Sequence, residues 1–198
     1  FMSISNNIFI NIYIMNTINF SQGINLVCFN KIDTITKTLD SIKSKVTTIS
    51  SLENNQISSS IYMDVGGTRT ILGDLKNLEY YQAYYVTCTD SVSLTYTKIY
   101  KQTGELKLAL GNNLKGFCNT EGRDINQILN YTEVNTISCV ENNKINASIN
   151  LTGGFIGDIT SIKCNLGYII NTSDSVVVDI YQNELVNMSV QYTAINQD

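Results

Sequence analysis

The side chains that could do chemistry in this chain are restricted first by the absence of histidine from its 198 residues. Without an imidazole the chain cannot form a Ser-His-Asp or Cys-His catalytic arrangement, and it has no imidazole metal ligand. Carboxylates remain, but Asp158, Asp174 and Asp179 are scattered along the chain. A carboxylate pair that cleaves glycosidic bonds has no sequence signature, so glycan hydrolysis is an alternative that no motif supports. We therefore predict no catalytic residue, no metal ligand and no cofactor site.

Tyrosine is the side chain with the clearest potential for ligand contact. The stretch EYYQAYYV contains Tyr80, Tyr81, Tyr84 and Tyr85. In a strand, Tyr81 and Tyr85 would lie on one face, and Tyr80 and Tyr84 on the other. Exposed tyrosines stack on sugar rings and are common at interfaces, whereas paired tyrosines on neighbouring strands stabilise a sheet. The four residues are therefore candidates either for ligand contact or for cross-strand packing.

The cysteines do not have the spacing of a metal site. Cys28, Cys88, Cys118, Cys139 and Cys164 are far apart, and no CxxC occurs, so a zinc site is not expected. One interpretation is that they are buried thiols acting as small apolar residues on strands. In a secreted protein, four of them could instead form disulfides, which would leave Cys28 as the candidate for an inter-chain bond.

Composition limits the class of protein. Hydrophobic residues make up 43% of the chain and charged residues only 15%, which is typical of a folded domain. The net charge is −4 and there is no basic patch, which argues against nucleic acid as a partner. The apolar stretch IFINIYI, residues 8–14, is too short to span a bilayer. Within an N-terminal segment 1–30, we expect it to be either a strand or residues that do not belong to the native protein.

Residues 54–198 have the pattern of strands. Runs rich in Val, Thr, Ile and Tyr are separated by turn signals, such as Gly66-Gly67 and the stretch from Glu141 to Lys144. This pattern predicts a mainly β fold, an antiparallel β-sandwich or jelly-roll head. A short helix is plausible within residues 121–131, and no repeat is apparent that would indicate a solenoid.

The stretch KIDTITKTLDSIKSKVTTIS, residues 31–50, departs from this pattern. Its aliphatic residues recur at gaps of three and four, and the flanking positions are polar, which favours a coiled-coil helix over residues 31–53. Isoleucine at each d position disfavours a two-stranded coil and favours three or four strands. The alternatives are an amphipathic helix packed on the chain's own sheet, or a strand. The seam residues are Ile32, Ile35, Leu39, Ile42, Val46 and Ile49.

A short coil followed by a β-rich head resembles the trimeric fibres and receptor-binding tips of viruses and phages, and trimeric heads of the C1q-like kind. The resemblance is carried by IDTITKTLDSIKSKVTTISSLENNQIS and otherwise extends only to the class of architecture. It implies a homotrimeric attachment protein at a virion surface or outside the cell, whose head binds a cell-surface glycan or protein. The first alternative is a monomeric secreted β-sandwich module that binds carbohydrate or protein. The second is a glycan-cleaving enzyme on the same sheets.

Overall fold

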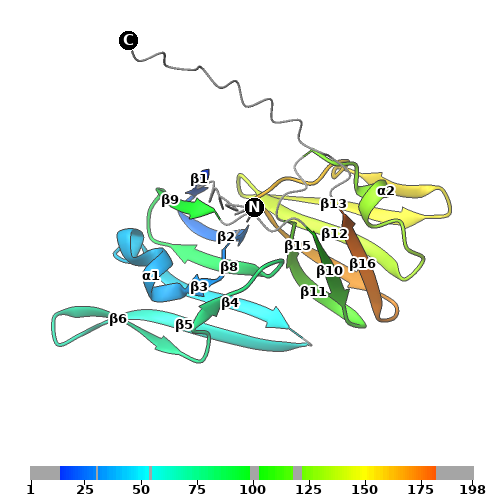
Figure 1. The fold of residues 1–198 in the computed structure, drawn as a ribbon. Helices are drawn as coiled ribbons and strands as arrows, with labels where there is room; N and C mark the ends of the chain where they lie inside the picture. The colour runs from blue at the N-terminus through cyan, green and yellow to red at the C-terminus, as the bar shows by residue number, and fades with distance from the viewer. Residues whose placement is uncertain (1–13, 30, 54, 99–102, 118–121, 182–198) are drawn as a thin grey trace, which may run out of the picture.

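A computed structural model describes residues 14–29, 31–53, 55–98, 103–117 and 122–181 (Figure 1). The protein is mainly β: 64% of the described residues lie in strands, which form several antiparallel sheets, and the same part of the chain has two short α-helices. This confirms the predicted class. The sequence predicts that residues 1–14 are either a strand or residues that do not belong to the native protein; Ile14 is the first residue of a strand, and residues 1–13 lie outside the described residues. Among the helices that are described, none has the length and apolar character needed to cross a membrane.

The described strands form two successive units, which lie side by side in Figure 1. In the first unit, a five-stranded sheet has the order β2-β8-β4-β5-β6, and β1 pairs with β9 in a separate two-stranded sheet. A minimal pair, β3 with β7, completes it. Its elements are β1 (Ile14–Phe20), β2 (Gly23–Cys28), β3 (Asp33–Thr34), α1 (Ile35–Leu39), a 3-10 helix (Asp40–Ile42), β4 (Val46–Glu53), β5 (Gln56–Val65), β6 (Thr68–Gly73), β7 (Asn77–Leu78), β8 (Ala83–Cys88) and β9 (Val92–Lys98).

The second unit repeats this arrangement. Its five-stranded sheet has the order β11-β15-β12-β13-β14, and β10 pairs with β16 as β1 pairs with β9. Its elements are β10 (Thr103–Leu108), β11 (Gly111–Gly116), α2 (Ile125–Ile128), β12 (Val134–Glu141), β13 (Lys144–Leu151), β14 (Gly154–Gly157), β15 (Gly167–Thr172) and β16 (Val176–Tyr181). Each unit has a hydrophobic core between its five-stranded sheet, its two-stranded sheet and its helix, and the core of the second unit also includes Cys28 and Tyr81 from the first.

Side-chain hydrogen bonds show which residues of the two units are equivalent. The Asn25 amide accepts from the Ser21 N–H at 2.8 Å and donates to the Ser21 carbonyl at 2.9 Å. Asn113 makes the same two bonds to Ala109, at 2.9 and 2.8 Å. Both asparagines bind the backbone at the start of the first strand of a five-stranded sheet, so β2 corresponds to β11.

The sequence contains the same duplication, although it has no short repeat that would make the duplication apparent. VTTISSLENNQISSSI, residues 46–61, aligns without a gap with VNTISCVENNKINASI, residues 134–149. These segments include β4 with β5 and β12 with β13, which form matching hairpins. The duplication is not a short solenoid repeat: each copy is a whole unit, and the helices and loops of the two copies differ. Direct comparison of the two hairpins would have revealed the duplication.

The predicted coiled coil is wrong. Of residues 31–53, only Ile35–Leu39 form an α-helix, and a 3-10 turn follows before β4 begins at Val46. Five of the six predicted seam residues are buried in the core of the first unit: Ile35, Leu39, Ile42, Val46 and Ile49. The sixth, Ile32, is exposed.

A β-bulge explains why the heptad spacing misled the prediction. In a regular strand, Val46 and Ile49 would point to opposite faces because they are three residues apart. The pairing of β4 with β8 shifts register between Val46 and Thr48, and this extra residue turns both aliphatic side chains inward. The second unit has the same bulge after Val134. Helical spacing thus arises from one helical turn followed by a bulged strand.

The predicted boundaries between a segment 1–30, a coil 31–53 and a head 54–198 do not match the described elements. The first boundary lies within the first unit, between β2 and β3, and the second falls in the hairpin between β4 and β5. The natural division lies instead between β9 and β10. The predicted turns at Gly66-Gly67 and between Glu141 and Lys144 do join neighbouring strands.

The two units meet through a reciprocal set of contacts. Val27 in β2 forms a bridge with Leu166, which precedes β15, and Lys115 in β11 forms the equivalent bridge with Gln82, which precedes β8. Between the bridges lies a small apolar cluster centred on Leu26, Ala83 and Leu114. Equivalent residues of the two units therefore make the same contacts across the junction. This is the pattern of an interface with two-fold symmetry.

Backbone hydrogen bonds repeat this symmetry. The Cys28 N–H donates to the Asn165 carbonyl at 3.0 Å, and the Gly116 N–H donates to the Tyr81 carbonyl at 2.9 Å. Cys28 and Gly116 end the equivalent strands β2 and β11. The duplicated unit is thus joined to its copy as two subunits of a symmetric dimer would be.

Candidate ligand-binding cleft between the units

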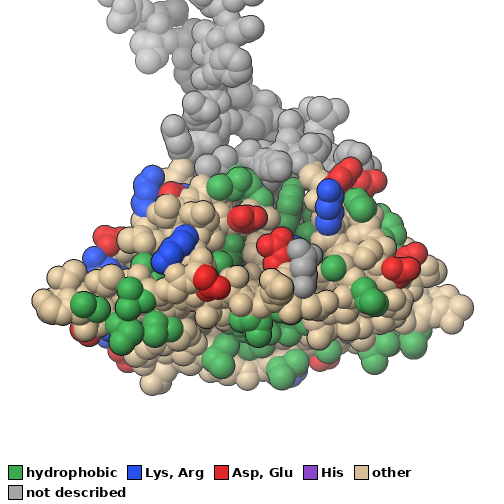
Figure 2. All heavy atoms as spheres, turned by 90° about the horizontal axis from the view of Figure 1, so that it is seen from below, with side chains coloured by type: hydrophobic (Ala, Val, Ile, Leu, Met, Phe, Trp, Pro, Cys, Tyr) green, Lys and Arg blue, Asp and Glu red, His purple; other side chains and the backbone are tan. Residues whose placement is uncertain are grey.

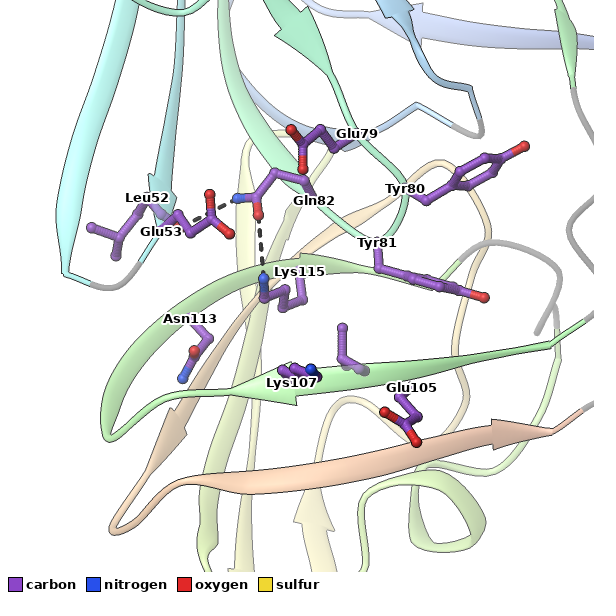
Figure 3. Close-up of a pocket in the computed structure, with 11 residues that line it drawn as sticks. Leu52, Glu53, Glu79, Tyr80, Tyr81, Gln82, Glu105, Lys107, Asn113 and Lys115 are labelled. Carbon is purple, nitrogen blue, oxygen red and sulfur yellow. Dashed lines mark hydrogen bonds between the residues drawn. The ribbon is translucent and has the colours of Figure 1, made fainter.

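A cleft of about 310 Å³ opens at this junction (Figure 3). It is lined by carboxylates, ammonium groups and tyrosines from both units. The lining residues that carry these groups are Glu53, Glu79, Tyr80, Tyr81, Glu105, Lys107 and Lys115. A second, more open hollow of about 620 Å³ adjoins it and shares Glu79, Tyr80, Tyr81 and Glu105.

Four parts of the fold bring these groups together. Glu53 ends β4, and Glu79, Tyr80 and Tyr81 belong to the turn between β7 and β8. The second unit contributes Glu105 and Lys107 from β10 and Lys115 from β11. In Figure 3 the rings of Tyr80 and Tyr81 extend in the same direction from the turn. Their centroids are 6.2 Å apart, and the ring planes are tilted by 48°. The turn thus forms an aromatic ridge between the two hollows.

Gln82 and Lys115 form the polar floor of the cleft. The buried Gln82 amide donates to the Leu114 carbonyl at 3.0 Å and also to the Ser51 hydroxyl. Its Oε1 accepts from Lys115 Nζ at 3.3 Å, the contact dashed in Figure 3. Both units therefore contribute to this polar pair, and it is in place only when they are packed together.

The ammonium group of Lys115 is in an unfavourable environment. Burial lowers its pKa below the usual value of 10.5, because a charge loses hydration in the cleft, while the carboxylates of Glu53 and Glu79 act in the opposite direction. The carboxylates of Glu53, Glu79 and Glu105 make no ion pair with any described residue. The cleft thus holds charged groups that the described contacts satisfy only in part.

The duplication supplies an internal comparison for this cleft. A hollow of about 300 Å³ on the other side of the junction is lined by the equivalent positions of the opposite units. There, Val27 stands in place of Lys115, and Leu166 in place of Gln82. Because Val27 and Leu166 form the same bridge, packing of the units does not require a lysine and a glutamine. The polar floor is therefore a feature that only one of the two clefts has.

The charges at the rim differ in the same way. In the second cleft, Lys163 Nζ binds Glu141 Oε1 at 2.7 Å. In the first cleft the corresponding residues are Glu79 and Glu53, two groups of like charge. The equivalence rests on the tyrosines that follow: Tyr84 Oη accepts from the Glu79 N–H at 2.7 Å, and Tyr168 Oη accepts from the Lys163 N–H at 2.8 Å. A closed ion pair in one cleft is thus an open carboxylate pair in the other.

The backbone at Tyr81 also distinguishes the clefts. Tyr81 has a φ of 60°, and its counterpart Asn165 has a φ of 67°. Asparagine adopts this left-handed conformation readily, but for a bulky residue such as tyrosine it is uncommon and costs energy. Strained residues of this kind cluster at functional sites. The tyrosine side chain at position 81 packs in the core of the second unit and also lines the cleft, although the backbone conformation there favours asparagine.

The structure brings together only two of the four predicted tyrosines. Tyr80 and Tyr81 line the cleft, although Tyr81 is only 7% exposed and also packs in the core of the second unit. Tyr84 is buried in the first core, tilted against Phe29 at 5.8 Å between centroids. Tyr85 packs against the apolar cluster between the units. The expected alternation placed Tyr81 with Tyr85, but β8 begins only at Ala83 and the first two tyrosines lie in the preceding turn. The charged residues of the cleft could not be predicted, because nothing in their spacing along the chain brings them together.

The cysteines do not form a site. Cys88 and Cys139 are buried free thiols, and burial raises the pKa of each to about 11. Cys28 is fully buried between the units, which does not suit the predicted inter-chain bond. Cys164 is half-buried in the second cleft, and Cys118 lies outside the described residues.

Within the described part of the chain, no three Cys, Asp or Glu side chains are grouped as a metal site requires. No protein-family model, curated protein or solved structure matches the chain. The residues of the cleft are therefore the basis for any functional proposal.

The lowered pKa of Lys115 predicts a pH effect on stability. The folded state holds this proton less tightly than the unfolded state, so the wild type gains stability as the pH rises from the folded pKa toward 10.5. Lys115→Met removes this dependence. Urea unfolding at several pH values should show the free energy of unfolding of the wild type rising relative to the variant above neutral pH. A constant difference would mean that Lys115 is fully hydrated in the folded protein.

Proposed function

We propose that this protein is a non-enzymatic binding module of two β-sandwich units, and that the cleft between them binds a cell-surface glycan. The observation that carries the proposal is the difference between the two equivalent clefts. One has Tyr80, Tyr81, open carboxylates and a half-buried lysine, and the other has a closed ion pair, Val27 and Leu166. The simplest explanation for open charges and tyrosines in only one of two equivalent clefts is that this cleft binds a ligand.

A glycan fits the chemistry of the charged cleft. Sugar rings present apolar C–H faces, which pack on aromatic side chains such as Tyr80, and hydroxyl groups, which donate to carboxylates such as Glu79 and Glu105. Two adjoining hollows separated by an aromatic ridge suit an oligosaccharide better than a single sugar. A cell-surface glycan as ligand would place the protein outside a cell.

The fibre hypothesis loses its main support, because the predicted trimer seam is buried within one chain. What remains of it is the role in attachment, now proposed for the cleft. The alternative of a β-sandwich binding module, with its helix packed on its own sheet, fits the burial of Ile35 and Leu39 in the first core.

A panel of soluble neutral oligosaccharides tests the proposal by isothermal titration calorimetry. For the best binder, Tyr80→Ala is expected to weaken binding about tenfold, because an aromatic contact worth roughly 1 kcal/mol and its buried area are lost. Glu79→Gln should also weaken binding without affecting the fold, since this side chain is exposed.

Cys164→Ala is the matched control, since Cys164 occupies the position of Tyr80 in the other cleft, and it should bind as the wild type does. Equal loss in both variants, or no binding across the panel, would refute the proposal. Release of shorter sugars during incubation would instead identify a glycan-cleaving enzyme.

A further inference from the structure

Each unit has an exposed apolar patch on its five-stranded sheet. The first patch consists of Ile57, Ile61, Met63 and Leu72 on β5 and β6. The second patch consists of Ile145, Ile149, Leu151 and Ile156 on β13 and β14. Figure 2 shows hydrophobic side chains gathered at the end of the molecule where Figure 1 places β5 and β6.

The two patches are equivalent in the duplicated units. Ile61 pairs with Leu72 across β5 and β6, and Ile149 pairs with Ile156 across β13 and β14. Directly paired residues of antiparallel strands point to the same face, so each pair forms one continuous apolar surface. All four positions are apolar in both units, although several of the residues between them differ. The exposed surface is thus a shared property of the unit.

The patches continue the face that already joins the two units. Leu52, which packs against the inter-unit cluster, pairs directly with Ile57, and Val140 likewise pairs with Ile145. Ile57 is 74% exposed and Ile145 is 72% exposed. The contact between the units therefore covers Leu52 and Val140 but not the residues paired with them. Within the chain, the covered part of this face packs on the equivalent face of the other unit.

We propose that the patches of one molecule pack on the patches of a second copy of this chain. The argument is that this face is already self-complementary near the junction, where its apolar side chains cover one another through contacts related by two-fold symmetry. The distal part has the same strands, the same face and the same kind of side chain in both units. An equivalent face from another molecule is therefore the occupant that the fold itself provides. Association would bury side chains that otherwise remain exposed to water.

Sedimentation velocity of the full chain over a wide concentration range tests the proposal. The wild type is expected to show an average mass that rises with concentration. A variant with Ile61→Thr and Leu72→Thr, and one with Ile149→Thr and Ile156→Thr, should each associate at least tenfold more weakly, and the combination should be monomeric. Threonine keeps the preference for strands, so circular dichroism should remain unchanged.

Val177→Thr provides the control, because Val177 is an exposed strand residue outside both patches, and its association should match the wild type. A wild type that is monomeric at every concentration would overturn the proposal, and so would association that the patch variants leave intact. Binding of the monomer to phosphatidylcholine vesicles, with loss of binding in the patch variants, would assign the patches to a lipid surface and overturn it as well.

Discussion

Replacing Ile42 with aspartate is expected to unfold the first unit. Ile42 is 3% exposed and packs in the core with Leu39 and Val46, so the variant would place a carboxylate among apolar side chains and away from water. We expect a loss of more than about 4 kcal/mol in the free energy of unfolding. Losses of this size are typical of substitutions that bury a charge or create a large cavity. Urea unfolding followed by circular dichroism measures it.

Ile32→Asp is the matched control, because Ile32 belongs to the same run of aliphatic residues but is 59% exposed. Its effect should stay within about 0.5 kcal/mol, as for most surface substitutions. If Ile42→Asp left the fold intact and altered only the oligomeric state, the coiled-coil interpretation would be correct and the burial described here would not.

Replacing Gly116 with alanine is expected to weaken the junction between the units. A Cβ atom on Gly116 would lie 2.1 Å from both Cβ and Sγ of Cys28, much closer than atoms can approach. Cys28 ends β2 and Gly116 ends β11, so the added methyl group would force these equivalent strands apart. Overpacking at such a site costs about 1–3 kcal/mol, which chemical denaturation can measure.

Two further variants separate this clash from general effects of removing glycine. Gly153→Ala should be nearly neutral, because no atom lies within 4 Å of a Cβ at that position. Cys28→Gly combined with Gly116→Ala should recover part of the loss, which a double-mutant cycle would report as coupling between the two sites. Without coupling, the two strands would not meet at Cys28 and Gly116.

The strands and their turns were predictable because they depend on neighbours in the sequence. Alternation of apolar and polar residues and the Gly66-Gly67 turn reflect local backbone geometry. The heptad interpretation failed for a non-local reason: the bulge at Val46 appears only when β4 pairs with β8, and it turns a strand's spacing into an apparent helical one.

Local patterns in the chain were enough to predict the mainly β class and the positions of several hairpins, and the lack of histidine excludes imidazole chemistry directly. The cleft depends on contacts between distant segments. Glu53, Tyr80 and Lys115 belong to strands and turns far apart in the chain, and they share a cleft because two copies of one unit pack through reciprocal contacts. The physical reason is that the alternation of apolar and polar residues shows which side of a strand is buried. It does not show which distant segment packs on that side, because this depends on how apolar surfaces come together in the folded chain.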